Sequence, residues 1–191
     1  MQIITLTLLI IIYLFAIPLF IFIWLLNLLL SGSPVMYEQK RIGKNGVAFT
    51  MYKFRTMIKG AEKQKHRLIK ANEVDGPVFK IYNDPRFTKF GKVLSRTGLD
   101  ELPQLINILK RDMNLVGPRP FPVDEAKRIS SKYKVREKVL PGIVSPWVVG
   151  GMHKLKFKEW MDLDINYVKN KNSFTDVSII CKSFILILRN I

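Results

Sequence analysis

Residues 2–30 read QIITLTLLIIIYLFAIPLFIFIWLLNLLL, a stretch without a single Asp, Glu, Lys or Arg. As a straight helix it would be about 43 Å long at 1.5 Å per residue. The apolar core of a bilayer is about 30 Å thick and needs only roughly 20 residues. A cleaved signal peptide does not fit, because the apolar run is too long and no basic segment precedes it. We therefore predict a membrane-embedded anchor over residues 1–34.

The shape of this anchor depends on Pro18, which lies near its middle. Proline removes one backbone hydrogen bond and clashes with the preceding turn, so we expect a kink there. The residues alone leave two geometries open. One is a tilted span with a kink, and the other is a re-entrant hairpin, since each arm is too short to span alone. Either way, the positive-inside tendency predicts that the rest of the chain faces the cytoplasm.

The rest of the chain is strongly basic. All 31 Lys and Arg lie after residue 37, against 15 Asp and Glu, which leaves a net charge of +16. Such a charge predicts attraction to nucleic acid, anionic lipid or phosphorylated substrates. A lone cysteine, Cys181, excludes an intramolecular disulfide, and no Cys/His spacing indicates zinc. A non-catalytic basic adaptor remains an alternative, although no nucleic-acid-binding motif is recognisable.

After Pro34 the composition changes, and we place a second domain at residues 35–191. Val35–Phe54 predicts a β-hairpin that turns at Asn45-Gly46. Ile58–Ala71 predicts a basic amphipathic helix. The apolar segment Val177–Ile191 either packs on the core or lies in the membrane interface. The predicted fold class is α+β, mostly helical with a small β-hairpin, behind an N-terminal membrane-embedded helix.

A second helical pattern carries paired acids. In TGLDELPQLINIL, residues 97–109, apolar side chains at 102, 105, 106 and 109 follow helical spacing and would bury one face. We expect Asp100 as the N-cap, Glu101 as the first helical residue, and Pro103 in the first turn, where its missing N–H is tolerated. Two carboxylates and a helix N-terminus then meet at one place. Helix capping alone would also explain them.

Constrained basic residues favour a functional site over simple capping. Arg119 lies between two prolines in Gly117-Pro118-Arg119-Pro120, so its backbone is stiff and its guanidinium is suited to hold phosphate. Lys53 and Arg55 add cations on the predicted hairpin. Carboxylates beside several fixed cations are typical of a magnesium-dependent site for phosphate chemistry.

Several motifs, taken in order, resemble those of the bacterial sugar transferases, the monotopic phosphoglycosyl transferases. The resemblance covers residues 35–170, and the chain is similar to the small form with one hydrophobic N-terminal segment. The motifs are Gln39-x-Arg41-x-Gly43-x-x-Gly46, Lys53-Phe54-Arg55-Thr56-Met57, Asn83-Asp84-Pro85-Arg86, Leu99-Asp100-Glu101-Leu102-Pro103-Gln104-Leu105, Gly117-Pro118-Arg119-Pro120, Pro141-Gly142-Ile143 and Leu163-Asp164-x-x-Tyr167-Val168.

The resemblance implies an enzyme that moves a sugar 1-phosphate from a UDP-sugar to undecaprenyl (polyprenyl) phosphate and releases UMP. This step starts a lipid-linked glycan of a capsule, exopolysaccharide, O-antigen or glycoprotein. Asp100 would be the nucleophile, forming a phosphosugar-aspartate, and the ligand of Mg²⁺, with Glu101 as its catalytic partner. The further phosphate-binding or substrate-binding candidates are Arg119, Lys53, Arg55, Arg41, Arg96 and Arg86.

The resemblance also favours the re-entrant anchor, in the bacterial inner membrane with the catalytic domain facing the cytoplasm. It implies membrane lipid as a partner and no nucleic acid, and it leaves a homodimer open. A catalytically inactive scaffold is the other alternative.

The sequence departs from the family pattern in three places. Ile17 precedes Pro18 where the family usually has serine, and Ser95 replaces an arginine, with Arg96 adjacent. Gly150-Gly151-Met152 stands where the family tends to have Asn-Gly-Arg. Since that last region contributes to donor recognition, the sequence predicts neither the donor sugar nor the glycan pathway.

Overall fold

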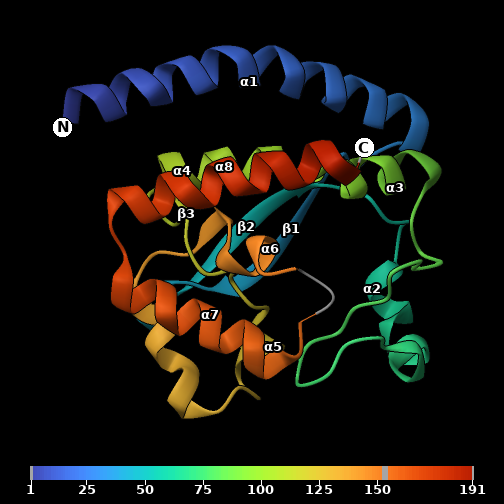
Figure 1. The fold of residues 1–191 in the computed structure, drawn as a ribbon. Coiled ribbons are helices and arrows are strands. Elements are labelled where there is room, and N and C mark those ends of the chain that lie inside the picture. The colour runs from blue at the N-terminus through green and yellow to red at the C-terminus, as the bar shows by residue number, and fades with distance from the viewer. Residues whose placement is uncertain (1, 152–154, 191) are drawn as a thin grey trace.

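The computed structural model describes the backbone of residues 2–151 and 155–190, and the side chains of residues 13–151 and 155–186. Helix α1 (Gln2–Ser31) curves over one face of a mostly helical domain that holds two small sheets (Figure 1). The α+β class with a small antiparallel hairpin is therefore confirmed. A parallel pair of strands was not predicted.

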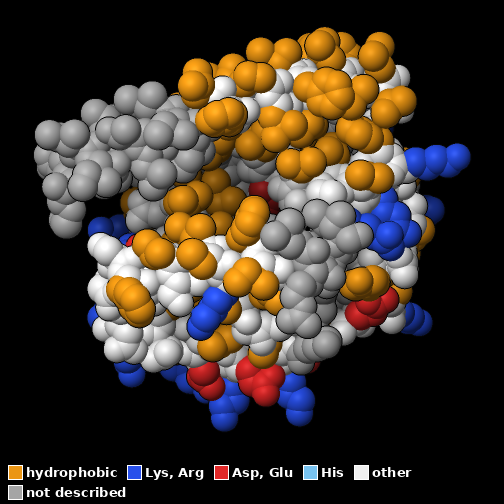
Figure 2. Space-filling model, turned by 45° about the horizontal axis from the view of Figure 1, so that its top comes forward, with side chains coloured by type: hydrophobic (Ala, Val, Ile, Leu, Met, Phe, Trp, Pro, Cys, Tyr) orange, Lys and Arg blue, Asp and Glu red, His pale blue; other side chains and the backbone are white. Residues whose placement is uncertain are grey.

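Helix α1 is continuous through Pro18 and is drawn as one curved rod in Figure 1. Its stretch Tyr13–Ser31 is long and apolar enough to cross a membrane. The re-entrant geometry stays a prediction. Figure 2 shows apolar side chains gathered over α1 and the face beneath it, while Lys and Arg project around the other edges.

The second half of α1 is tied to the domain. Ile23 packs in a buried cluster with Val35, Phe54 and Leu94. Asn27 is completely buried, and its amide nitrogen donates to the carbonyl of Arg55 at 3.0 Å. The anchor is therefore joined to the domain by packing and by hydrogen bonds from the Asn27 side chain to backbone carbonyls.

The predicted hairpin is confirmed. Strands β1 (Met36–Ile42) and β2 (Ala48–Phe54) pair antiparallel, from Met36 opposite Phe54 to Ile42 opposite Ala48. A single 3-10 turn, η1 (Lys44–Gly46), joins them. Asn45 and Gly46 both have positive φ, 55° and 76°, as the Asn-Gly signal predicts.

The helix expected over Ile58–Ala71 is wrong in extent and type. The segment holds one α-helical turn, α2 (Ala61–Gln64), followed by the 3-10 helix η2 (Lys65–Ala71). Only Ala61 is buried in these two elements. A segment with so little buried surface has no packed face to stabilise a regular α-helix.

The segment with the paired acids also differs from its prediction. Helix α3 (Lys89–Thr97) ends at Gly98, whose φ of 72° opens the 3-10 helix η3 (Leu99–Gln104), followed by α4 (Leu105–Leu109). Gly98, and not Asp100, is the N-cap, and no side chain caps η3. Asp100 and Glu101 therefore both lie inside the first turn.

The predicted apolar face of this segment is wrong at its end. Leu109 is 66% exposed, whereas Asn107 is completely buried. The Asn107 amide donates to the carbonyl of Thr50 at 2.7 Å and accepts from the N–H of Tyr52 at 3.2 Å. A buried polar side chain here satisfies edge groups of β2, which a hydrophobicity pattern does not reveal.

The C-terminal half surrounds a short parallel sheet. Strands β3 (Asn114–Val116) and β4 (Gly142–Val144) form it, with α5 (Val123–Ala126), η4 (Ser131–Lys138) and α6 (Pro146–Val149) between and after them. Helices α7 (Phe157–Asn170) and α8 (Ser173–Asn190) cover it.

The predicted packing of the C-terminal segment is confirmed on one face of α8. Ile179 is buried in a cluster with Val116 and Tyr167. Phe184 and Ile185 are 62% and 55% exposed, so another face of α8 is apolar and uncovered. Contact of that face with a membrane interface stays a prediction.

Candidate active site

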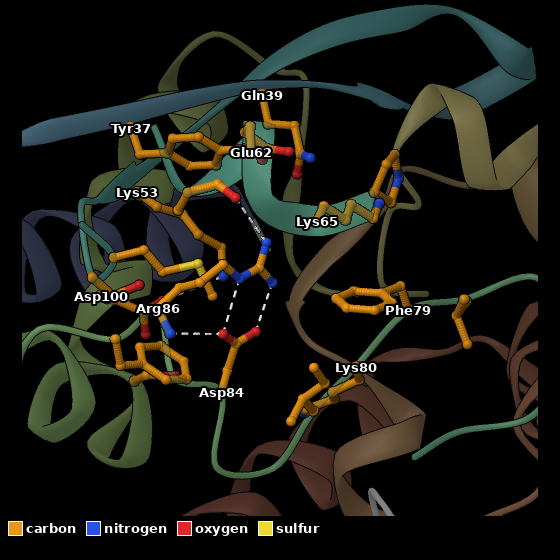
Figure 3. Close-up of a pocket in the computed structure, with 18 of the residues that line it drawn as sticks. Tyr37, Gln39, Lys53, Glu62, Lys65, Phe79, Lys80, Asp84, Arg86 and Asp100 are labelled. Atoms are coloured by element: carbon orange, nitrogen blue, oxygen red, sulfur yellow. Dashed lines mark hydrogen bonds and ion pairs between the residues drawn. The ribbon is translucent and has the colours of Figure 1, made fainter. Parts of the chain in front are cut away.

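A cavity of about 680 Å³ brings together distant parts of the chain (Figure 3). Its walls come from the hairpin, the loop between η2 and α3, the start of η3, and the loop after β3. At one side it reaches Pro34 and Arg55, next to the end of α1. Polar and charged residues that line it include Tyr37, Gln39, Arg41, Lys53, Lys80, Asp84, Arg86, Asp100, Arg119 and Glu125.

The two predicted catalytic acids differ in position. Asp100, 7% exposed, borders the cavity, and Lys53 Nζ lies 3.4 Å from its Oδ2. Glu101 is not among the described residues that line the cavity. Its Oε1 accepts hydrogen bonds from Lys53 Nζ at 2.7 Å and from Arg119 Nη2 at 2.8 Å. Glu101 therefore holds two cations, while Asp100 faces the open space.

The two carboxyl groups also differ in electrostatics. Burial raises the pKa of Asp100 above its ordinary value, and the neighbouring Glu101 adds to the shift although Lys53 opposes it. Burial would raise the pKa of Glu101 too, but Arg119 and Lys53 outweigh burial and hold that pKa well below its usual range. Glu101 is thus the more strongly held anion, and Asp100 is the more basic carboxylate.

The Pro-Arg-Pro loop is fixed by four consecutive backbone carbonyls. The carbonyls of residues 118 and 121 accept from the N–H groups of Gly142 at 3.1 Å and Ile42 at 2.9 Å. Those of residues 119 and 120 accept from the guanidinium groups of Arg136 and Arg41, both at 2.6 Å. The backbone that carries the Arg119 side chain is therefore rigid, as the flanking prolines predict.

Arg41 and Arg136 have positioning roles in this arrangement. Arg41 was predicted to bind substrate; it borders the cavity, and its guanidinium also contacts Gln39 Oε1 at 2.9 Å. Arg136 was not predicted at all. It is buried and makes an ion pair with the fully buried Asp164 at 2.7 Å. The family motif around Asp164 was the only signal that could have pointed to this pair.

Arg86 borders the cavity but is already engaged. Its Nε and Nη2 bind the two oxygens of Asp84 at 2.9 and 2.6 Å, and its Nη1 donates to the carbonyl of Ala61 at 3.1 Å (Figure 3). The hydrogen bonds and the charge of Asp84 raise the pKa of Arg86, although burial opposes the shift. Arg86 therefore lies in the cavity wall as one half of a buried ion pair with Asp84. Its role in phosphate binding stays a prediction.

Arg55 and Arg96 do not take part in the ion pairs of the Lys53–Glu101–Arg119 group. The Arg55 guanidinium donates to the carbonyls of Ser31 and Gly32, so it caps the end of α1. Arg96 is exposed on the last turn of α3, while its neighbour Ser95 borders the cavity. Among the described residues, neither guanidinium group forms an ion pair with Asp100 or Glu101, although Arg55 borders the same cavity.

Lys80 and Trp147 are cavity residues that the sequence analysis did not single out. The Lys80 ammonium lies 5.0 Å from the centre of the Trp147 ring, and the Arg119 guanidinium lies 5.8 Å from the same centre. Lys80 follows the turn Gly76-Pro77 and resembles an ordinary surface lysine in the sequence. Its partner is 67 positions away, so local spacing carries no signal for the contact.

The carboxylates fit one kind of metal site. Among the described residues, no three His, Cys, Asp or Glu side chains form a group that could hold a metal. Magnesium, however, usually binds through one or two carboxylates together with water and substrate phosphates. Asp100 offers a carboxylate to the cavity, while Glu101 Oε1 already has two cationic partners. Asp100 is therefore the residue that would hold Mg²⁺, and it would need substrate phosphates or water as the further ligands.

Comparisons with known proteins identify the family of this chain. The chain belongs to the bacterial sugar transferase family, whose family model matches residues 1–190. Galactosyl transferase CpsE of Streptococcus agalactiae is 40% identical over 159 residues, which are 83% of this chain and 35% of CpsE.

Two further relatives have different lengths. The undecaprenyl-phosphate galactose phosphotransferase of Salmonella typhimurium is 35% identical over 184 residues, 94% of this chain and 38% of the relative. Exopolysaccharide production protein ExoY of Rhizobium meliloti is 35% identical over 170 residues, 87% of this chain and 75% of ExoY. The chain thus spans little more than a third of CpsE and of the Salmonella protein.

Proposed function

We propose that this protein is a phosphoglycosyl transferase that moves a sugar 1-phosphate from a UDP-sugar to undecaprenyl phosphate and releases UMP. The observation that carries the proposal is the exposure of the Asp100 carboxylate to a cavity in which Lys53 and Arg119 are held in place by Glu101. The names of the relatives, one of them an undecaprenyl-phosphate galactose phosphotransferase, support the same reaction.

In the first step an Asp100 carboxylate oxygen attacks the β-phosphorus of the donor. The bond from that phosphorus to the bridging oxygen breaks, and its electron pair leaves with UMP. The raised pKa of Asp100 makes its ionised form a better nucleophile. Lys53 and Arg119 face the charge that develops on the phosphoryl oxygens, and their fixed positions avoid reorganisation during the reaction.

In the second step a phosphate oxygen of the lipid carrier attacks the same phosphorus. The bond between phosphorus and the Asp100 oxygen breaks, which restores the carboxylate and leaves a sugar diphosphate lipid. Two separate displacements at one nucleophile lead to ping-pong kinetics.

The position of the cavity suits an acceptor that is held in a membrane. Its wall includes Pro34 and Arg55, beside the end of α1. The exposed apolar side chains of α1 would lie in lipid, so a polyprenyl phosphate would reach Asp100 from that side. We propose the bacterial inner membrane with the domain in the cytoplasm, where nucleotide sugars are made.

Magnesium fits this scheme at the Asp100 carboxylate. When bound there, it would supply positive charge to the phosphate oxygens of the donor. The residues of this chain do the rest: Asp100 attacks, Lys53 and Arg119 orient the phosphates, and Glu101 holds both cations. We expect a chelator to stop UMP release and added Mg²⁺ to restore it.

The test is UMP release by purified protein with undecaprenyl phosphate and a panel of UDP-sugars that includes UDP-galactose. We expect the Asp100→Asn variant to release no UMP, because the amide is not a nucleophile. Asp162→Asn, which changes an exposed acid on α7, is the matched control and should keep full activity. Near-normal turnover by the Asp100 variant would contradict the proposal.

A further inference from the structure

We propose that Lys80 is a third cation of the donor site, which binds the diphosphate of the nucleotide sugar and is positioned by Trp147 and Asn72. This inference rests on the proposed function and deepens it. No family motif quoted above includes Lys80, and the contacts that assign it come from three separate elements.

The backbone of Lys80 is fixed from both sides. Its N–H donates to Asn72 Oδ1 at 2.7 Å, and its carbonyl accepts from the N–H of Glu73 at 2.9 Å. The Asn72 amide nitrogen also donates to the carbonyls of Val74 and Val78, at 2.8 and 3.0 Å. One asparagine thus closes the whole turn that precedes Lys80, and this turn sets the direction of the lysine side chain.

The side chain of Lys80 borders the cavity and shares an aromatic surface with Arg119. The Lys80 ammonium and the Arg119 guanidinium lie 5.0 and 5.8 Å from the centre of the Trp147 ring. Cations are attracted to the face of a tryptophan. The ring is itself held against Trp160, with 5.1 Å between ring centroids. Trp147 therefore gathers two cations at one wall of the cavity.

The charge around Lys80 favours an anion. Burial and the nearby Arg119 and Lys53 cations together lower the pKa of Lys80 to about 7, although Glu101 and Asp100 act in the opposite direction. Glu101 and Asp100 offset only part of the charge of Lys53, Lys80 and Arg119, so this part of the cavity keeps a net positive charge. A diphosphate, with a charge on each phosphate, would complement that charge.

The position of Lys80 favours the donor over the lipid acceptor. The loop that carries it, between η2 and α3, runs through the part of the molecule away from α1 in Figure 1. In Figure 3 Lys80 lies across the Asp84–Arg86 pair from Asp100 and Lys53. The acceptor phosphate would enter beside α1, so Lys80 is placed for the phosphate that leaves with UMP.

The experiment measures KM for the UDP-sugar, KM for undecaprenyl phosphate and inhibition by UMP in the same preparations. We expect Lys80→Met to raise KM for the donor and the inhibition constant of UMP by about tenfold or more, as for loss of a charge-assisted hydrogen bond. Its KM for the carrier should not change. Lys80→Arg should recover most of the loss, and Lys134→Met, at an exposed lysine on η4, should have no effect.

Two variants test the positioning role of Trp147. We expect Trp147→Leu to raise KM for the donor, and Trp147→Phe, which retains a ring face for the cations, to recover part of it. Thermal unfolding of each variant identifies loss of folding. If Trp147→Leu and Trp147→Phe have the same KM for the donor at equal unfolding midpoints, the ring face does not position the cations and the assignment to Trp147 is overturned.

The possible failures are distinct. If the unchanged protein releases no UMP from any UDP-sugar, the proposed function and this inference fall together. If it is active but Lys80→Met keeps its KM for the donor, the inference alone is overturned. A raised KM for the carrier with an unchanged KM for the donor would assign Lys80 to the acceptor and contradict the donor site.

Discussion

Adjacent carboxyl groups at residues 100 and 101 have opposite electrostatic surroundings. Glu101 accepts hydrogen bonds from Lys53 and Arg119 and stays ionised. Asp100 is buried at the cavity wall, and the same Lys53 lies farther from it, at 3.4 Å. Such a difference suits a reaction in which one carboxylate attacks and the other stays a fixed anion. The lone motif Asp-Glu does not reveal which residue has which role. The contacts with Lys53 and Arg119 distinguish the surroundings of the two acids, and the role proposed for Asp100 follows from that difference.

Removal of the charge at Glu101 tests this division. We expect Glu101→Gln to lower kcat by about a hundredfold to a thousandfold, the range known for loss of one preorganised electrostatic contact. The physical reason is that Lys53 and Arg119 lose their shared anion. Glu38→Gln, an exposed residue on β1, is the control. A change in kcat of less than about threefold would contradict a positioning role for Glu101.

The pH dependence of donor binding tests the environment of Lys80. Burial and the cations of Arg119 and Lys53 lower the pKa of Lys80 to about 7, although Glu101 and Asp100 act to raise it. Below pH 7 the ammonium is charged before the donor arrives; above pH 7 it must first take up a proton. KM for the UDP-sugar should therefore rise between pH 7 and 8.5, by at most about tenfold per pH unit. Initial rates at each pH measure it.

The Lys80→Arg variant is the control for this pH profile. A guanidinium stays charged throughout the range, so the rise in KM should disappear. An identical rise in that variant would assign the titration to another group.

Part of the site was predictable from single residues, and part was not. The structure brings Asp100, Lys53 and Arg119 together, as the resemblance of their three motifs to one family pattern led us to expect. Arg55 was predicted with them, but its guanidinium is used at the end of α1. Motifs show which residue types occur together along the chain. They do not show which way a side chain points.

At the scale of elements, the Pro-Arg-Pro loop depends on groups from β1, η4 and β4. Each of four consecutive carbonyls, from residue 118 to 121, has a donor from outside the loop. Gly142 is required for this arrangement, since a Cβ there would lie 2.0 Å from the nitrogen of Gly117. The small parallel sheet therefore serves to fix the loop that carries Arg119.

Arg136→Met tests how far the loop depends on η4. The substitution removes the donor to the Arg119 carbonyl and leaves the fully buried Asp164 without its ion-pair partner. We expect a loss of about 3–5 kcal/mol in the free energy of unfolding, as for other broken buried pairs. Denaturant unfolding in detergent micelles measures it. Exposed Arg128→Met, on the loop after α5, is the control, and equal stability of both variants would contradict this account.

The type of a helix, strand or turn was predictable from the sequence where neighbouring residues alone determine it. The Asn45-Gly46 turn and its hairpin were correctly predicted, because the turn needs two residues that tolerate positive φ. The helix over Ile58–Ala71 and the burial of Leu109 were wrong, because both depend on what packs against them. Asn107 takes the buried position near Leu109 since β2 presents unpaired backbone groups there.

At the scale of the whole molecule, an apolar helix is joined to a basic domain of net charge +16. Two forces would hold such a protein at a membrane: burial of the exposed α1 side chains in lipid, and attraction of Lys and Arg to anionic headgroups. They respond differently to salt. Salt at about 1 M shortens the Debye length to roughly 3 Å and removes most of the second force.

Extraction of membranes therefore tests which force dominates. We expect the protein to stay in the membrane pellet at about 1 M salt, with a Debye length of roughly 3 Å, and to be released by detergent. The physical reason is that α1 exposes a long apolar surface, including Leu29 and Phe15 at 79% and 73%. Immunoblots of pellet and supernatant measure it. Release by salt alone would contradict the membrane-embedded anchor.

The central claim is that Asp100 becomes covalently bound to the sugar phosphate. Its most direct test is the intact mass of the protein after incubation with Mg²⁺ and the UDP-sugar that it uses, without any lipid acceptor. The account predicts a gain equal to one sugar phosphate, located on Asp100, which disappears on addition of undecaprenyl phosphate and is absent from Asp100→Asn. An active protein that releases UMP only when the acceptor is present, with no gain in mass, would contradict it.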